Sequence, residues 1–84
     1  MTLRTAAHPD QLARVIAAVF GIPADTVTEE SRPETIPQWD SMSHINLVLA
    51  LEDEFGVSFS AEDMVEMLSV RLIRLILAER GVTA

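Results

Sequence analysis

The sequence predicts an all-α fold, a small four-helix bundle of three longer helices and one short helix with a long loop between the first two. Apolar residues recur at three- and four-residue spacing in several segments, and glycines stand where these segments end. Almost no stretch alternates in the manner of a β-strand. At 84 residues, the chain is expected to form a single domain over residues 1–84 with a modest hydrophobic core.

The first helix is expected over Pro9–Phe20, with Pro9 at the first helical position and Asp10 in the first turn. Gly21 and Pro23 end it. Its apolar residues at helical spacing are Leu12, Val15, Ile16 and Val19.

A loop of about twenty residues, 21–40, follows. A loop this long is unusual in a compact domain, so it indicates either a functional segment or a missed element. The residues expected to anchor it to the core are Ile22, Val27 and Ile36.

The second helix is expected over Ser41–Phe55, with Asp40 as its N-cap and Gly56 as its stop. The alternating segment after it, residues 57–59, is too short to pair as a strand, and we expect an extended loop with Phe59 buried.

The short third helix is expected over Ala61–Met67, where Ser60 and Asp63 have the spacing of a capping box. The fourth starts after Ser69 and ends near Arg80. Its expected buried stripe is Val70, Ile73, Ile76 and Leu77.

Charge and cysteine content narrow the possible functions. The net charge is −7, there is no lysine, and the segment 25–66 holds eleven acids against one base, Arg32. An acidic surface repels nucleic acid and favours protein partners with basic docking patches. Because the chain has no cysteine, disulfides and thiolate metal sites are excluded, and sulfur chemistry would need an imported thiol. No apolar run is long enough to span a membrane and no signal peptide is expected, so the prediction is a cytoplasmic protein.

The second helix carries more apolar surface than one core contact requires. Leu47, Ala50, Leu51 and Phe55 form a core stripe, while a second stripe lies on another side of the helix. We interpret that second stripe as a docking surface, and the alternative is that the bundle covers this helix on both sides. The expected docking residues are Met42, Ile45 and Leu49, with Asn46, Glu52 and Asp53 at their border.

Ser41 stands where a helix N-terminus would stabilise a phosphate ester, beside the acid Asp40. The simpler alternative is that Ser41 only caps the helix. A nucleophile–base pair of Ser41 and His44 is conceivable because the two are three residues apart, but no orienting acid or oxyanion hole is readable. We therefore expect His44 to be a partly exposed polar residue near the phosphate, and we expect no catalytic residues and no metal site.

A further pattern begins with Asp40-Ser41-Met42 and continues with Leu47, Ala50-Leu51-Glu52, Glu54-Phe55-Gly56 and Ser69-Val70. With these residues the chain resembles the acyl carrier proteins from about Ile36 to Ile76, and the run from Trp39 to Phe59 is the most specific part of the match. The family usually has Asp-Ser-Leu where this chain has Asp40-Ser41-Met42.

The resemblance implies a non-catalytic carrier in which a phosphopantetheinyl transferase attaches 4′-phosphopantetheine to Ser41. The thiol of that arm would hold acyl groups as thioesters. Implied partners are an acyl-loading ligase or acyltransferase and condensing or modifying enzymes with basic docking patches, and such carriers are usually monomers.

Departures from the family pattern indicate the pathway. Ser43 and Asn46 stand where carriers of fatty-acid synthesis usually have acids, and Arg71 and Arg74 stand where acidic or neutral residues are more usual. They favour a discrete carrier of a specialised lipid or polyketide-like pathway. Because Asp-Ser-Met also occurs in D-alanyl carriers, an aminoacyl cargo stays open. An unmodified helical interaction module is the remaining alternative.

Overall fold

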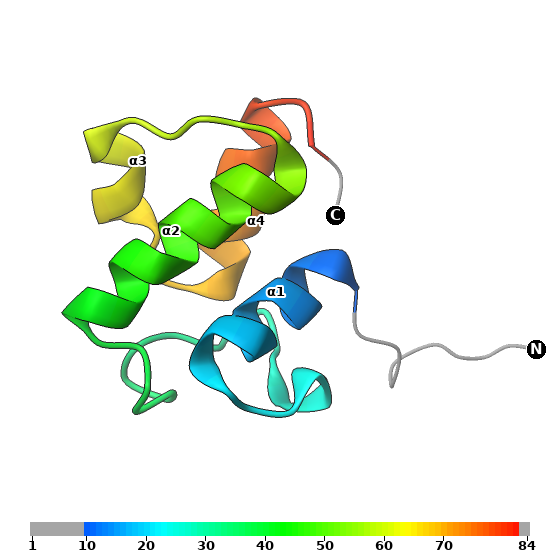
Figure 1. Ribbon diagram of the computed structural model, residues 1–84, viewed down its shortest axis with the longest axis vertical. Helices are drawn as coiled ribbons and strands as arrows, with labels where there is room; N and C mark the ends of the chain where they lie inside the picture. The colour runs from blue at the N-terminus through cyan, green and yellow to red at the C-terminus, as the bar shows by residue number, and fades with distance from the viewer. Residues whose placement is uncertain (1–9, 83–84) are drawn as a thin grey trace, which may run out of the picture.

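The computed structural model describes residues 10–82 and confirms the predicted all-α fold (Figure 1). Within that range the chain forms three longer α-helices, one short α-helix and one 3₁₀ turn, with no strand. These elements are α1 (Gln11–Phe20), η1 (Ala24–Thr26), α2 (Ser41–Phe55), α3 (Ala61–Glu66) and α4 (Val70–Glu79).

Helix α1 begins two residues later than the sequence predicts. Asp10 has an extended backbone, and its carboxylate accepts the N–H of Ala13 at 2.9 Å, so it is the N-cap rather than a first-turn residue. The prediction for Pro9 lies outside the described residues. Gly21 ends the helix as expected, with φ of 68° in the left-handed region that glycine adopts without steric cost.

The boundaries of the other helices follow their capping residues. Asp40 and Gly56 bound α2 as predicted, and Ser60 and Asp63 form the predicted capping box of α3. Helix α3 ends at Glu66, one residue before the predicted end, and Ser69 caps α4.

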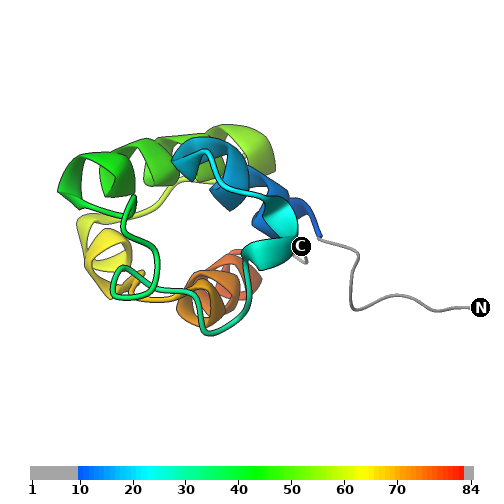
Figure 2. The same cartoon turned by 90° about the horizontal axis from the view of Figure 1, so that it is seen from below.

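The four α-helices share one hydrophobic core. In Figure 2, α2 and α1 lie along one side of the bundle and α4 along the opposite side, while α3 lies between α2 and α4 at one end. The predicted stripe of α4 is buried, and residues from every helix or its flank are fully buried. Burying one large aliphatic side chain stabilises a fold by roughly 1.5–3 kcal/mol. The fully buried side chains are Leu12, Ile16, Leu47, Leu51, Met67, Val70, Ile73 and Leu77.

Apolar anchors hold the loop 21–40 to the core, and the loop contains the short 3₁₀ helix η1, which was not predicted from the sequence. The three predicted anchors pack against the core, with Ile36 buried and Ile22 and Val27 half-buried. The predicted burial of Phe59 is only partly realised, because that side chain is half-buried against the core.

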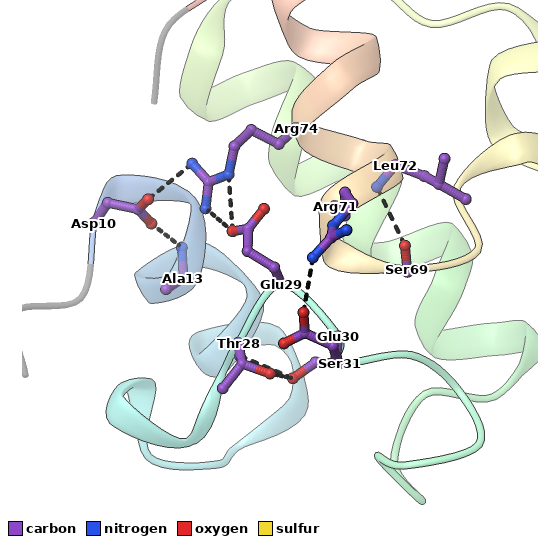
Figure 3. Close-up of polar contacts among 10 residues, drawn as sticks. All are labelled: Asp10, Ala13, Thr28, Glu29, Glu30, Ser31, Ser69, Arg71, Leu72 and Arg74. Atoms are coloured by element: carbon purple, nitrogen blue, oxygen red, sulfur yellow. Dashed lines mark hydrogen bonds and ion pairs between the residues drawn. The ribbon is translucent and has the colours of Figure 1, made fainter. Parts of the chain in front are cut away.

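Arginines of α4 fasten the loop to the bundle (Figure 3). Arg74 contacts the carboxylates of Asp10 and Glu29, each at 2.8 Å, and so joins α4 to the start of α1 and to the loop. Arg71 pairs with Glu30 at 2.7 Å. Burial works to raise the pKa of Asp10, but the Ala13 N–H and Arg74 together hold it below its usual value.

Backbone hydrogen bonds reinforce this attachment. The N–H of Val70 donates to the carbonyl of Ser31 at 2.9 Å, and the N–H of Arg71 donates to the carbonyl of Glu29 at 3.1 Å. The first N–H groups of a helix have no partner within the helix, so the loop satisfies two that α4 would otherwise leave open.

No helix in the described part of the chain combines the length and the apolar character that crossing a bilayer requires.

Candidate functional site

The candidate site is the N-terminus of α2, where Ser41 is the first helical residue and is exposed to solvent. The cap belongs to Asp40, whose carboxylate accepts the N–H of Ser43 at 2.9 Å. Within residues 10–82 no hydrogen bond engages the Ser41 hydroxyl. The alternative that Ser41 serves only as a cap is therefore wrong, and its hydroxyl is available for modification.

The acid beside the serine is held ionised. The backbone N–H of Ser43 is the main group that lowers the pKa of Asp40 below the usual aspartate value. At neutral pH this carboxylate accepts hydrogen bonds at the helix start and has no proton to donate to a reaction at Ser41.

Trp39 fixes the turn that leads into Ser41. Its ring is buried and lies against Phe20 of α1, with ring centroids 5.3 Å apart. Its indole Nε1–H donates to Nδ1 of His44 at 2.9 Å. Trp39 therefore both packs in the core and makes a polar contact with His44.

His44 connects α2 to α3 through both of its ring nitrogens. An indole nitrogen can only donate, so Nδ1 of His44 accepts, and the ring proton lies on Nε2. Nε2 donates to the carbonyl of Met64 at 2.8 Å, in the last turn of α3. Since both nitrogens are engaged, this geometry does not provide a base for Ser41.

A groove with a volume of about 480 Å³ lies beside Ser41, between the start of α2 and the α3–α4 connection. Asp40 and His44 also line it on the α2 side. Its other walls are mostly apolar and come from Pro33, Trp39, Met64, Val65, Met67 and Leu68. A group attached to Ser41 would therefore have an apolar surface directly next to it.

The outer face of α2 begins beside Ser41. Met42, Ile45 and Leu49 are 73%, 49% and 58% exposed, while Leu47 and Leu51 on the opposite side are fully buried. The prediction of two apolar faces on this helix is confirmed. The alternative, in which the bundle covers both sides, is wrong.

The border of this face is less uniform than predicted. Asn46 and Asp53 are exposed, but Glu52 is half-buried, and its carboxylate accepts the N–H of Phe59 at 2.9 Å. Glu52 therefore holds the α2–α3 loop in place, and Asp53 is the more accessible of the two acids.

The structure brings the predicted site residues together and adds several that the sequence analysis missed. Asp40, Ser41 and His44 share one groove, and Met42 lies next to Ser41 on the adjoining face. The contribution of α3 and Leu68 was missed, because no local pattern shows which residues a bundle brings next to a helix start. Met64 of α3 is half-buried, and its carbonyl accepts the hydrogen bond from His44.

Comparison with known proteins points in the same direction as the site. No family model matches the sequence. An acyl carrier protein of Saccharopolyspora erythraea is 40% identical over 48 residues, which cover 57% of this chain. The matched part spans about half of that relative's length. The chain is therefore similar to an acyl carrier protein over part of its length.

Proposed function

We propose that this chain is an acyl carrier protein, acting as one carrier domain over residues 1–84, in which Ser41 carries 4′-phosphopantetheine. The observation that carries the proposal is the exposed Ser41 hydroxyl, left unengaged among the described residues because Asp40 provides the cap. The similarity to a curated acyl carrier protein supports it independently.

The local electrostatics suit a phosphodiester at Ser41. The N-terminus of a helix carries a partial positive charge and stabilises a nearby anion. The negative charge of Asp40 lies next to the proposed phosphodiester and would repel it. The hydrogen bond from the Ser43 N–H holds that carboxylate against the helix backbone. The groove walled by Met64, Val65 and Leu68 supplies an apolar surface for the uncharged part of the arm.

The arm, when attached, would supply a terminal thiol that holds acyl groups as thioesters. That group has no substitute in this chain, which contains no cysteine. The chain itself would contribute attachment, presentation and docking, and the proposal assigns it no catalysis. The groups next to Ser41 agree with this assignment, because the Asp40 carboxylate accepts the Ser43 N–H and both ring nitrogens of His44 are engaged.

The outer face of α2 is proposed as the surface that partner enzymes bind. Partners would be the phosphopantetheinyl transferase, an acyl-loading ligase or acyltransferase, and condensing or modifying enzymes. Three exposed apolar side chains next to the modified serine would bring each partner's active site close to the arm. Asp53 at the border would favour basic patches on those enzymes.

The pathway is proposed to be a specialised lipid or polyketide-like one in the cytoplasm. Ser43 and Asn46 leave the outer face of α2 less acidic than in carriers of bulk fatty-acid synthesis, which the family resemblance implies are charged there. Arg71 and Arg74, the other departure, have structural roles here because they hold the loop to α4. An aminoacyl cargo of the D-alanyl type is the second candidate, on the Asp40-Ser41-Met42 motif.

Intact-mass spectrometry tests the proposal. We expect the purified chain, incubated with coenzyme A and a broad-specificity phosphopantetheinyl transferase, to gain the mass of one phosphopantetheinyl group. Ser41→Ala should abolish the gain, whereas Ser43→Ala, in the same helical turn, should retain it. A folded, unmodified chain that gains no mass would instead support an unmodified interaction module.

A further inference from the structure

A second apolar surface, not predicted from the sequence, lies on the α4 side of the bundle. Leu68, Leu72 and Leu75 are 60%, 37% and 55% exposed. They line a groove of about 300 Å³ together with Ile76, Glu66 and Glu79, and we call it the α4 groove. Several exposed leucines gathered in one groove differ from the scattered apolar residues of an ordinary protein surface.

The buried stripe of α4 does not require these leucines. Val70, Ile73 and Leu77 already bury the inner side of the helix. A helix needs only one apolar stripe to pack against a core, and its opposite side is normally polar. Leu72 and Leu75, three residues apart, therefore make a separate exposed apolar strip on α4.

The border of the α4 groove is negatively charged. Glu66 and Glu79 line it, and neither forms an ion pair within residues 10–82. The nearby arginines are engaged elsewhere, because each is held by carboxylates of another element. These pairs join Arg71 to Glu30, Arg74 to Asp10 and Glu29, and Arg80 to Asp63.

We propose that the α4 groove binds an amphipathic helix of a partner protein, with aliphatic anchors flanked by lysine or arginine. An apolar groove with an acidic border suits such a helix, whose side chains at three- and four-residue spacing fill the groove. Helix α4 has ten residues and is about 15 Å long, which matches about three turns of a bound helix. This proposal goes beyond the carrier function and holds whether or not Ser41 is modified.

The α4 groove adjoins the groove beside Ser41, so a partner bound on α4 would lie close to the proposed attachment point. Leu68 lines both the α4 groove and the groove beside Ser41. A helix bound on α4 would therefore lie next to the arm while leaving the outer face of α2 open. Two partners could then contact the carrier at once, one on each apolar face.

Charge argues against the other occupants of such a surface. A second copy joined through the same groove would bring Glu66 and Glu79 of both copies together, and each chain carries a net charge of −7. An anionic membrane surface would be repelled by the same glutamates. A cationic helix is the occupant that these charges attract.

The test uses two synthetic helical peptides and the 84-residue chain with Ser41→Ala, so that modification plays no part. One peptide carries leucines at three- and four-residue spacing with flanking lysines, and its counterpart carries glutamates in place of the lysines. We expect an NMR titration with the lysine peptide to shift the amides of Leu68, Leu72 and Leu75 most. We expect binding of the glutamate peptide to be roughly tenfold weaker.

Matched variants assign the binding to one face. Leu75→Gln should lower the affinity for the lysine peptide roughly fivefold or more, which is the usual effect of losing an anchor side chain. Leu49→Gln on α2 should leave that affinity unchanged. Both positions are exposed, and circular dichroism checks that each variant folds. Absence of binding, loss of binding in Leu49→Gln alone, or equal binding of the glutamate peptide would overturn the proposal. The proposal would also be overturned if the chain formed a dimer, or bound phosphatidylglycerol vesicles, and Leu75→Gln abolished that dimer or that binding.

Discussion

Helices α2 and α4 each place apolar side chains on both the core side and the solvent side, but their exposed faces stand in different relations to Ser41. The exposed face of α2 starts at Met42, directly after the serine. The α4 groove does not include Ser41 among its lining residues and shares only Leu68 with the groove beside that serine. A partner on α2 thus meets the attachment point itself, whereas a partner on α4 lies beside it.

The two faces also differ in how the sequence encodes them. Residues 41–55 are apolar around most of the helix, so the sequence itself predicts a second apolar stripe on α2, and the exposed fractions of its side chains decide that it faces solvent. Residues 70–79 hold two arginines among mostly apolar residues and have a clear buried stripe. The buried stripe alone is enough to predict α4 as a helix that packs on the core. That Leu72 and Leu75 form a second, exposed apolar surface becomes clear only from their exposed fractions.

The largest effect is expected from testing the two sides of α2 against each other. Leu47 is fully buried and Leu49 is 58% exposed, so the same substitution removes core packing at one position and little at the other. Leu47→Ala should lower the free energy of unfolding by about 2–5 kcal/mol, and Leu49→Ala by less than about 0.5 kcal/mol. Chemical denaturation of both variants measures the difference, and similar losses would contradict the assignment of faces.

Much of the fold could be predicted because its signals are local. Asp40 and Gly56 bound α2 by capping chemistry, and Ser60 with Asp63 marks the start of α3. The single turn η1 could not be predicted, because three residues are too few to show a helical period. At the first helix, Pro9 suited the first helical position, but Asp10 provides the cap and starts the helix later.

The candidate site was predictable only in part, since some of its contacts join residues far apart in sequence. The exposure of Ser41 and Met42 follows from their position on α2. The bond from His44 to the carbonyl of Met64 spans twenty residues and involves a backbone group, which residue types do not reveal. The role of Glu52 at Phe59 was missed for the same reason.

The next largest effect is expected on the rate at which Ser41 is modified, measured with one substitution on each exposed face. Ile45→Glu places a charge in the centre of the α2 face, so the rate of transfer by a phosphopantetheinyl transferase should fall about tenfold. Leu75→Glu makes the same change on α4 and should leave that rate nearly unchanged. Initial rates measured by intact mass separate the two. If Ile45→Glu unfolds the chain instead, then Ile45 contributes to the core and the assignment of Ile45 to a docking face is wrong.

A smaller effect is expected from the polar contact that places α3 between the two faces. Trp39→Phe keeps an aromatic ring against Phe20 but removes the N–H that Nδ1 of His44 accepts. We expect a loss of about 0.5–1.5 kcal/mol in stability and faster amide exchange at Met67 and Leu68, which follow the carbonyl that His44 holds. Unchanged exchange there would show that the Trp39–His44 contact does not hold α3 in place.

The smallest effect concerns the charges beside the two faces. Asp53 borders the α2 face and Glu79 lines the α4 groove, and both are exposed. If the transferase approaches α2 with a basic patch, Asp53→Lys should slow modification a few-fold at low salt, and the effect should shrink as salt screens the charges. Glu79→Lys makes the same change in net charge, but it should not slow modification, because α4 does not face that partner. Equal slowing by both variants would mean that the transferase responds to the overall charge of the chain rather than to the border of one face.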